Sequence, residues 1–199
     1  MKNLFILGSP HKNGNSATMA EAVGQGLQTN RNNSVEYIYL NELTIQPCQG
    51  CGACSSTGKC ILEDDMEKVS KLTEEADRLF FVSPIYFYSV TAQLKCFIDR
   101  CQPQWAQKYL LKTHGNAQEI RSGYFLSCAA TNGEKLFDGA EMIIKCLCDT
   151  LHIQYGAPLL LRNADTEDSI KNNPATLAEC VAFGEKLAAD RTQTIVSPA

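Results

Sequence analysis

Short apolar runs alternate with amphipathic segments along the whole chain. Residues 4–7 are all apolar and end at Gly8, which is typical of a parallel strand buried on both faces. A helical pattern follows, with Asn15 or Ser16 as its N-cap. Four more strands are predicted at 35–40, 79–82, 124–126 and 157–161. Four more helices are predicted, starting at 64 or 65 and spanning 91–101, 139–151 and 173–190.

Five strand–helix units in one chain indicate an α/β fold with a doubly wound, five-stranded parallel sheet. The flavodoxin-like strand order 2-1-3-4-5 places the ligand site beyond the carboxyl ends of strands one and three. Both strands run into Ser-Pro loops, at Ser9 and at Ser83. We therefore expect a single domain over residues 1–192, with an inserted four-cysteine loop at 48–60 and a C-terminal tail at 193–199.

The composition narrows the classes of partner and compartment. The 199 residues suit one domain, and the formal net charge is −4 without any cluster of lysine and arginine. A chain with this charge and no basic cluster is not expected to bind nucleic acid or a membrane surface. The apolar run before Gly8 has only four residues, too few for a signal peptide, and no apolar stretch is long enough to span a membrane. We expect a cytoplasmic protein.

Four of the ten cysteines stand within thirteen residues, with the spacing C-x2-C-x2-C-x5-C: Cys48, Cys51, Cys54 and Cys60. An all-sulfur site is typical of zinc or an iron–sulfur cluster. Structural zinc sites mostly use two separated knuckles, whereas here three thiols share one short loop, which favours a cubane cluster. Zinc, or four thiols without metal, remains the alternative interpretation.

The other cysteines and the histidines carry weaker signals. In a reducing compartment we expect the remaining six cysteines, Cys128 excepted, to be small buried hydrophobic residues. The three histidines, His11, His114 and His152, suggest no metal triad or catalytic dyad. Lys95 and Asp99, four apart on a predicted helix, are expected to form a surface ion pair.

Residues 8–16 join strand one to the first helix and are rich in small and polar side chains. Free N–H groups at a helix N-terminus favour an anion, so the loop predicts a phosphate site; a plain polar turn is the alternative. The dinucleotide-binding fingerprint is absent. The loop does not match the nucleoside-triphosphate motif either, because in that motif the lysine follows the second glycine, whereas Lys12 precedes Gly14. A single terminal phosphate, such as that of FMN, fits better. The candidate binding residues here are Ser9, His11, Asn13, Asn15, Ser16 and Ala17.

Two later loops are candidates for holding a flavin ring. In residues 83–89, backbone amides are placed to meet the ring's polar edge, and apolar or aromatic side chains to pack on its face. The candidates in this loop are Pro84, Ile85, Tyr86 and Phe87, and in residues 127–133 they are Cys128, Ala129 and Thr131. Ordinary core packing in the first loop and a generic turn in the second are the alternatives.

Residues 102–121 are predicted to be a long irregular connection that covers a site or an interface. Trp105 and Tyr109 are its candidate interface anchors, since buried aromatic residues commonly take that role. Packing inside their own subunit is the alternative.

Four segments in this order resemble the iron–sulfur flavoprotein family, which lies within the NADPH-dependent FMN reductase group. They are Gly8-Ser-Pro-x-x-x-Gly-Asn-Ser16, the cysteine loop followed by Asp64-Asp65-Met66, Ser83-Pro-Ile-Tyr86, and Lys95-Cys-Phe-Ile-Asp-Arg100. The resemblance covers roughly the first 135 residues, and the cysteines are its most specific part.

The resemblance implies one FMN and one [4Fe–4S] cluster per subunit, with the four clustered cysteines as ligands. It implies that Ser9, Asn15, Ser16 and Ala17 hold the phosphate and that residues 84–87 line the ring. A homodimer or homotetramer is also implied, in which one subunit's cluster lies near the partner's flavin. The family often has arginine where this chain has His11, so the phosphate lacks one permanent positive charge unless Lys12 supplies it.

The expected function is an FMN-dependent oxidoreductase or electron-transfer protein that exchanges electrons between FMN and the cluster. NAD(P)H or a ferredoxin-type protein is the candidate donor, a small molecule is a candidate acceptor, and no catalytic acid or base is assigned. The alternatives are an NAD(P)H-dependent FMN or quinone reductase without a cluster, a flavodoxin-like electron carrier, and a zinc-stapled binding module.

Overall fold

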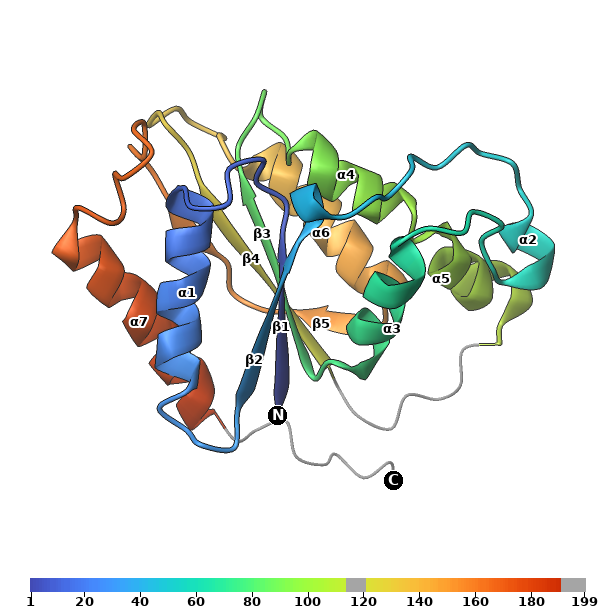
Figure 1. Ribbon diagram of the computed structural model, residues 1–199, viewed down its shortest axis with the longest axis horizontal. Helices are drawn as coiled ribbons and strands as arrows, with labels where there is room; N and C mark the ends of the chain where they lie inside the picture. The colour runs from blue at the N-terminus through green and yellow to red at the C-terminus, as the bar shows by residue number, and fades with distance from the viewer. Residues whose placement is uncertain (114–120, 191–199) are drawn as a thin grey trace.

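A parallel sheet divides the helices into two layers in the computed structural model, which describes residues 1–113 and 121–190 (Figure 1). The strands are β1 (Lys2–Leu7), β2 (Ser34–Tyr39), β3 (Arg78–Pro84), β4 (Arg121–Cys128), β5 (Ile153–Tyr155) and β6 (Leu159–Leu161). Their order is β2-β1-β3-β4-β5, with β6 also paired to β4. The predicted α/β class and strand order are confirmed.

The fifth position of the sheet differs from the prediction of one strand at 157–161. Two short strands share it: β5 pairs with the start of β4, and β6 pairs with its end. Between them Gly156 donates its N–H to the Gly123 carbonyl, at 2.8 Å, and Pro158 has no N–H to donate. The edge of the sheet is therefore interrupted where one continuous strand was expected.

Helices cover both faces of the sheet. On one face lie α1 (Asn15–Leu27) and α7 (Pro174–Ala189), and on the other lie α3 (Met66–Glu75), α4 (Ala92–Asp99) and α6 (Asp138–Thr150) (Figure 1). Two short helices, α2 (Cys54–Thr57) and α5 (Gln102–Ala106), stand apart from the sheet as a lateral lobe (Figure 1). The remaining elements are η1 (Leu40–Glu42) and η2 (Gln107–Leu111).

The alternation of β1 builds both halves of the core. Leu4 and Ile6 pack with α3, α4 and α6, whereas Phe5 and Leu7 pack with α1 and α7. The Phe5 ring stacks on Phe80 of β3, with ring centroids 4.2 Å apart. Because both faces are buried, β1 is held rigidly, and the loop that follows it starts from a fixed point.

Helix α1 is held against α7 by a glycine contact. A Cβ atom at Gly26 would lie 2.1 Å from the Val181 carbonyl, and one at Gly184 would lie 2.1 Å from the Val23 carbonyl. Only glycine permits this close crossing. The contact fixes the direction of α1, whose N-terminus points at the carboxyl edge of the sheet (Figure 1).

Two local predictions are corrected by the structure. The N-cap of α1 is Gly14, because the Asn15 side chain is used elsewhere. The stretch expected to be irregular from residue 102 is helical through Leu111, first as α5 and then as the π-helical turn η2. The rest of that stretch at 114–120, including His114, and the tail predicted at 193–199 lie outside the described residues. In the described ranges no helix is long and apolar enough to cross a membrane.

Candidate functional site

The loop after β1 is locked to the sheet and to α4. Gly8 donates its N–H to the Val82 carbonyl, at 2.8 Å, and the Thr91 hydroxyl donates to the Gly8 carbonyl. A Cβ atom at Gly8 would lie 2.5 Å from Leu94 Cβ, so the close approach of α4 requires glycine here. The chain then turns through Ser9, whose Oγ accepts the His11 N–H at 3.1 Å, and reaches the N-terminus of α1.

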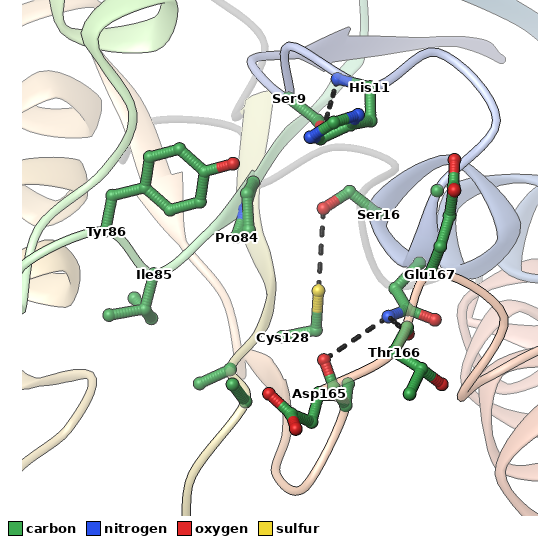
Figure 2. A pocket seen from close by; sticks show the side chains of 15 residues that line it. Ser9, His11, Ser16, Pro84, Ile85, Tyr86, Cys128, Asp165, Thr166 and Glu167 are labelled. Carbon is green, nitrogen blue, oxygen red and sulfur yellow. Dashed lines mark hydrogen bonds between the residues drawn. The ribbon is translucent and has the colours of Figure 1, made fainter.

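A cavity of about 260 Å³ opens at this carboxyl edge, between the ends of β1, β3, β4 and β6 (Figure 2). Loops from four separate parts of the sequence line it. Its lining residues are Ser9, His11, Gly14, Asn15, Ser16, Pro84, Ile85, Tyr86, Cys128, Ala129, Ala130, Ala164, Asp165, Thr166 and Glu167. Its position is the switch point at which doubly wound sheets bind ligands.

Nine of the thirteen predicted cofactor-binding residues line this cavity, and four do not. The nine are Ser9, His11, Asn15, Ser16, Pro84, Ile85, Tyr86, Cys128 and Ala129. Of the other four, Ala17 belongs to α1 and is buried in the core, Asn13 and Thr131 are exposed, and Phe87 is fully exposed.

Phe87 is turned away from the cavity by a two-residue hairpin. Tyr86 and Ser89 exchange backbone hydrogen bonds of 3.0 Å in both directions, which leaves Phe87 and Tyr88 at the tip. Both tip residues have positive φ, 50° and 60°, an unfavourable conformation for aromatic residues. The turn keeps Tyr86 at the cavity wall and points the tip side chains into solvent.

The loop at 164–167 was not predicted as part of the site. It is attached to α1 by Asn15, whose Nδ2 donates to the Thr166 carbonyl at 2.7 Å and to the Ala164 carbonyl at 3.3 Å. The Asn15 Oδ1 also accepts the Ile170 N–H, at 2.9 Å. The Asn15 side chain is therefore engaged within the protein, and only its backbone remains for a ligand. The sequence offers one indication of this loop's role, which is that it follows the predicted fifth strand and so lies at the carboxyl edge of the sheet.

The ionisable side chains around the cavity are those of His11, Asp165 and Glu167, with no lysine or arginine among the described residues that line it. Lys12, the other candidate cation of the first loop, forms an ion pair with Glu42 and lies over the Tyr39 ring at 5.2 Å. An anion in this cavity would therefore depend on hydroxyls and on the N–H groups of the first turn of α1, which have no partner within the helix.

Cys128 closes the floor of the cavity next to Ser16. Their side chains approach to 3.5 Å between Sγ and Oγ (Figure 2). Burial raises the pKa of the Cys128 thiol, and the contact with Ser16 opposes this only in part. Near neutral pH the side chain is a neutral thiol that forms an apolar wall rather than a nucleophile.

The four clustered cysteines border a second cavity, of about 370 Å³, in the lateral lobe. Cys48, Cys51 and Cys60 are exposed and Cys54 is half-buried, all as free thiols. The loop is shaped by Gly50, Gly52 and Gly58, whose φ angles of 63°, 75° and 68° lie in the left-handed region that favours glycine. The turns between the cysteines thus depend on the glycines interspersed with them.

The Cys54 thiol is affected by burial and by the three cysteines near it. Burial raises the pKa of the Cys54 thiol, and the neighbouring thiolates raise it further. Within residues 1–113 and 121–190, however, no three Cys, His, Asp or Glu side chains are close enough to hold one metal ion as they stand. The thiols share a cavity without converging on a single-ion geometry.

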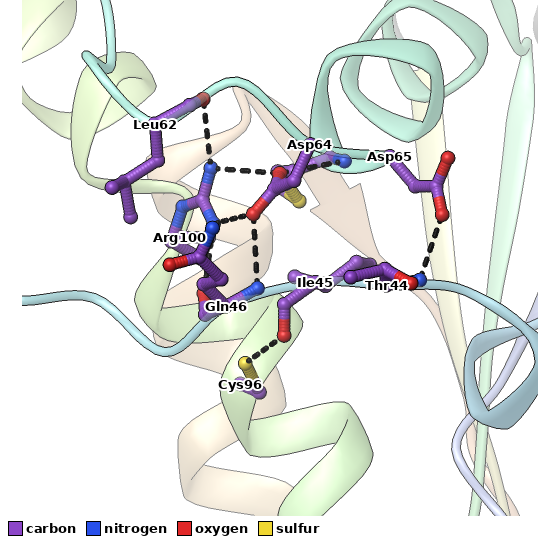
Figure 3. Close-up of polar contacts among 9 residues, drawn as sticks. Thr44, Ile45, Gln46, Leu62, Asp64, Asp65, Cys96 and Arg100 are labelled. Carbon is purple, nitrogen blue, oxygen red and sulfur yellow. Dashed lines mark hydrogen bonds and ion pairs between the residues drawn. The ribbon is translucent and has the colours of Figure 1, made fainter.

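Arg100 and Asp64 form a buried ion pair at the base of the cysteine loop (Figure 3). The Arg100 Nη1 donates to Asp64 at 2.6 Å, and its Nη2 donates to the same carboxylate at 3.1 Å. Asp64 also accepts the N–H groups of Gln46 and Met66, at 2.9 and 3.0 Å. The contact with Met66 agrees with the prediction that residue 64 or 65 caps this helix.

The predicted burial of the cysteines outside the loop is confirmed for three of them, and the predicted surface ion pair is confirmed. Cys101, Cys148 and Cys180 are buried as expected, whereas Cys96 is half-buried and Cys146 is exposed, because it lies on the outer face of α6. Lys95 and Asp99 form the expected exposed ion pair, at 2.7 Å.

The two candidate interface anchors lie on the outside of the lobe. Trp105 and Tyr109 are 38 % and 44 % exposed, and their rings pack at 5.7 Å between centroids. Their role at an interface stays a prediction.

Comparisons with known proteins agree with this geometry. The model of the NADPH-dependent FMN reductase family matches residues 1–131. An iron–sulfur flavoprotein of Archaeoglobus fulgidus is 38 % identical over 123 residues, which are 62 % of this chain and 56 % of that protein. An iron–sulfur flavoprotein of Methanocaldococcus jannaschii is also 38 % identical, over 52 % of this chain and 53 % of its own length. The matches thus span about half the length of these relatives.

Solved structures share the fold over nearly the whole chain. An NAD(P)H:quinone oxidoreductase from Methanothermobacter marburgensis aligns with a TM-score of 0.69 at 18 % identity, covering 96 % of this chain and 98 % of its own. A structure described as a flavone reductase aligns with a TM-score of 0.71 at 20 % identity, over 94 % of this chain and 62 % of its own.

Proposed function

The chain belongs to the NADPH-dependent FMN reductase family, and we propose that it is an oxidoreductase exchanging electrons between FMN and a [4Fe–4S] cluster. The observation that carries this proposal is the pair of cavities. One lies at the carboxyl edge of the sheet, and the other is bordered by four thiols in the lobe.

The first loop would hold the FMN phosphate. Ser9 and Ser16 are buried at the cavity wall and offer hydroxyls, and the first turn of α1 offers backbone N–H groups. With Lys12 paired to Glu42, His11 is the nearest candidate for a positive charge. The site would thus bind the phosphate chiefly through neutral donors and the helix N-terminus.

The opposite wall would hold the flavin ring. Pro84, Ile85 and Tyr86 line one side of the cavity, and Cys128 lies at its floor (Figure 2). Ala129 also lines the cavity. A flavin bound here would accept a hydride's two electrons and release them one at a time. The protein's own part is to orient the ring against an apolar wall and to exclude water from that face.

The four thiols of the lobe suit a cluster better than a single zinc ion. Zinc needs all four sulfurs about 2.3 Å from one point, and the thiols do not converge in that way. A cluster would contribute its own iron and sulfide, so that each thiolate would bind a different iron, and it would carry one electron at a time. Cys48, Cys51, Cys54 and Cys60 would be its ligands.

The donor, the acceptor and the assembly are part of the proposal. NAD(P)H is the candidate hydride donor, in line with the family's description. A ferredoxin-type donor or a small-molecule acceptor would exchange single electrons at the exposed thiol lobe. A homodimer or homotetramer would bring a partner's flavin near that lobe.

A second candidate function is an FMN-dependent NAD(P)H or quinone reductase whose thiols stay free. The exposed thiols, which do not converge as they stand, favour this alternative. Both candidates share the FMN cavity and differ only in the lobe.

Purification without oxygen, followed by absorption spectroscopy and analysis of FMN, iron, sulfide and zinc, separates the two candidates. The main proposal predicts one FMN and about four iron and four sulfide per chain. FMN without iron would support the second candidate, and zinc without iron would contradict the cluster. A chain without FMN would overturn both.

A further inference from the structure

Two motifs of the family resemblance meet at the base of the cysteine loop, away from the FMN cavity. The Asp64-Asp65-Met66 segment begins α3, and Arg100 ends α4. The side chains of Asp64 and Arg100 are each only 2 % exposed, although the loop above them is open to solvent. A buried ion pair beneath an exposed loop is costly to desolvate, which points to a specific role.

Arg100 ties both ends of the cysteine loop together (Figure 3). Its Nη1 donates to the Gln46 carbonyl at 2.7 Å, two residues before Cys48. Its Nη2 reaches the Leu62 carbonyl at 3.5 Å, two residues after Cys60. The guanidinium therefore holds the start and the end of the loop at fixed positions relative to Asp64.

One donor of Arg100 remains unused. The Nη1 and Nη2 groups are engaged by Asp64, Gln46 and Leu62, but the buried Nε–H has no hydrogen-bond partner among the described residues. Leaving a buried donor unpaired costs about 1–3 kcal/mol, and more when the group is charged. A buried donor of this kind calls for an explanation, and a ligand beside it is one such explanation.

The cysteine cavity is where that ligand would lie. Arg100 is one of the residues lining the cavity, together with Cys60. Cys60 also stands only two residues before Leu62, whose carbonyl accepts from the Arg100 Nη2.

We infer that Arg100 is a positioning residue for the metal centre, whose free Nε–H donates to the Cys60 sulfur while Asp64 fixes the guanidinium. The inference rests on the proposed cluster and adds a residue to its surroundings. Hydrogen bonds to cluster sulfurs favour the more negatively charged, reduced state and so raise the reduction potential. Arg100 therefore sets how readily the centre accepts an electron.

The first test compares R100K with wild type after purification without oxygen. Lysine keeps a positive charge beside Asp64, but it lacks the planar pair of Nη groups and the separate Nε–H of the guanidinium. We expect iron content to be retained and the reduction equilibrium constant to fall by roughly threefold to tenfold, tenfold being about 59 mV for one electron. An unchanged midpoint potential with full iron would overturn the inference.

R121K is the matched control. Arg121 is a second partly buried arginine, at the amino end of β4, where it donates to the carbonyls of Ala76 and Thr73. The same substitution there changes a partly buried, hydrogen-bonded cation away from the cysteine cavity. The midpoint potential should equal that of wild type, and an equal fall in both variants would overturn a specific role for Arg100.

A second measurement needs no substitution. Wild-type protein labelled with ¹⁵N-arginine and then reduced should show a ¹⁵N coupling to the paramagnetic centre in pulsed EPR. If R100K loses its iron, the spectrum of the wild-type protein tests the inference instead. A ¹⁵N coupling would support the inference, and the absence of a coupling would overturn it. Wild-type protein that binds FMN but no iron would instead overturn the cluster proposal, and this inference with it.

Discussion

The two cavities are built in opposite ways. The one at the sheet edge draws its walls from four distant parts of the chain, and its Ser9, Ser16 and Cys128 are buried. The one in the lobe draws all its thiols from residues 48–60, most of them exposed. The first is a product of the whole fold, whereas the second is a product of one local segment. The two sites should therefore fail separately when each is damaged.

Loss of one thiol should have the largest effect and should be confined to the lobe. Cys54→Ala removes the half-buried member of the set, so we expect iron to fall below a tenth of the wild-type content. FMN should stay within twofold of wild type, as measured by flavin release and iron analysis. Cys146→Ala, which removes an exposed thiol from α6, is the matched control and should keep its iron. Coupled loss of both cofactors would contradict the separation of the two sites.

Ser16→Glu should damage the cavity at the sheet edge, so that FMN is lost while iron is retained. A carboxylate there would occupy the proposed phosphate position and repel the anion, so we expect FMN affinity to fall at least about a hundredfold, or roughly 2.7 kcal/mol. Iron content should be unchanged. Titration of FMN fluorescence measures the affinity, and circular dichroism checks the fold.

Thr18→Glu is the matched control for this substitution. Thr18 lies in the same first turn of α1 but is not among the residues lining the cavity. The control should bind FMN within twofold of wild type. Equal losses in both variants would show that general charge near the helix, rather than the loop site, weakens binding.

Asp64→Asn should destabilise the attachment of the lobe. Removing one member of a buried ion pair leaves the other charge unpaired, so we expect the free energy of unfolding to fall by about 3 kcal/mol. Urea denaturation measures this. Asp99→Asn, which breaks the exposed pair with Lys95, is the control and should change stability by less than about 1 kcal/mol.

The same pair predicts a pH dependence. Burial opposes ionisation of Asp64, but hydrogen bonds from Arg100 and from the backbone hold its pKa below its usual range. This contribution is complete above the unfolded carboxyl's pKa, near 4, and is lost as the pH falls through the lower folded value. Wild type should therefore lose more stability than Asp64→Asn over that acid range. Parallel curves would contradict the role of this carboxylate.

His11→Arg should produce the smallest effect, an increase of roughly threefold to tenfold in FMN affinity. Arginine would add a permanent positive charge and a planar set of N–H donors beside the phosphate. FMN titration measures the gain. Equal or weaker affinity would show that His11 does not face the phosphate.

The sequence alone predicts the layers and the strand order because apolar runs reveal buried parallel strands. It does not reveal β5, since Ile153–Tyr155 has only three residues and one of them is exposed. It also misses the helical character of residues 102–111, a segment whose regularity depends on contacts with the lobe. There the Gln107 side chain donates to the Gly58 carbonyl, at 2.7 Å.

The cavity at the sheet edge is predictable where its residues follow apolar strands. The first three loops could be identified in this way, but the loop at 164–167 carries no motif and is placed by its attachment to Asn15. Side-chain direction is the part that sequence cannot give. Phe87 follows the same strand as Tyr86, yet a tight hairpin turns it into solvent.

The pairing of Asp64 with Arg100 also cannot be predicted from the sequence. Each residue belongs to a recognisable segment, but 36 positions separate them and nothing in the local pattern joins them. Only the fold brings the start of α3 to the end of α4. The contact joins both segments at the base of the cysteine loop.

The clamp formed by Arg100 also bears on how the lobe could arise and change. Because Gln46 and Leu62 are held together at its base, the segment between them behaves as a closed insertion into the domain. The entropy cost of a closed loop grows slowly with length, by about 0.6 kcal/mol for each doubling. Evolution or a protein engineer could therefore lengthen, shorten or replace this segment while the parent sheet stays intact, which makes the cysteine loop between Gln46 and Leu62 a transplantable module.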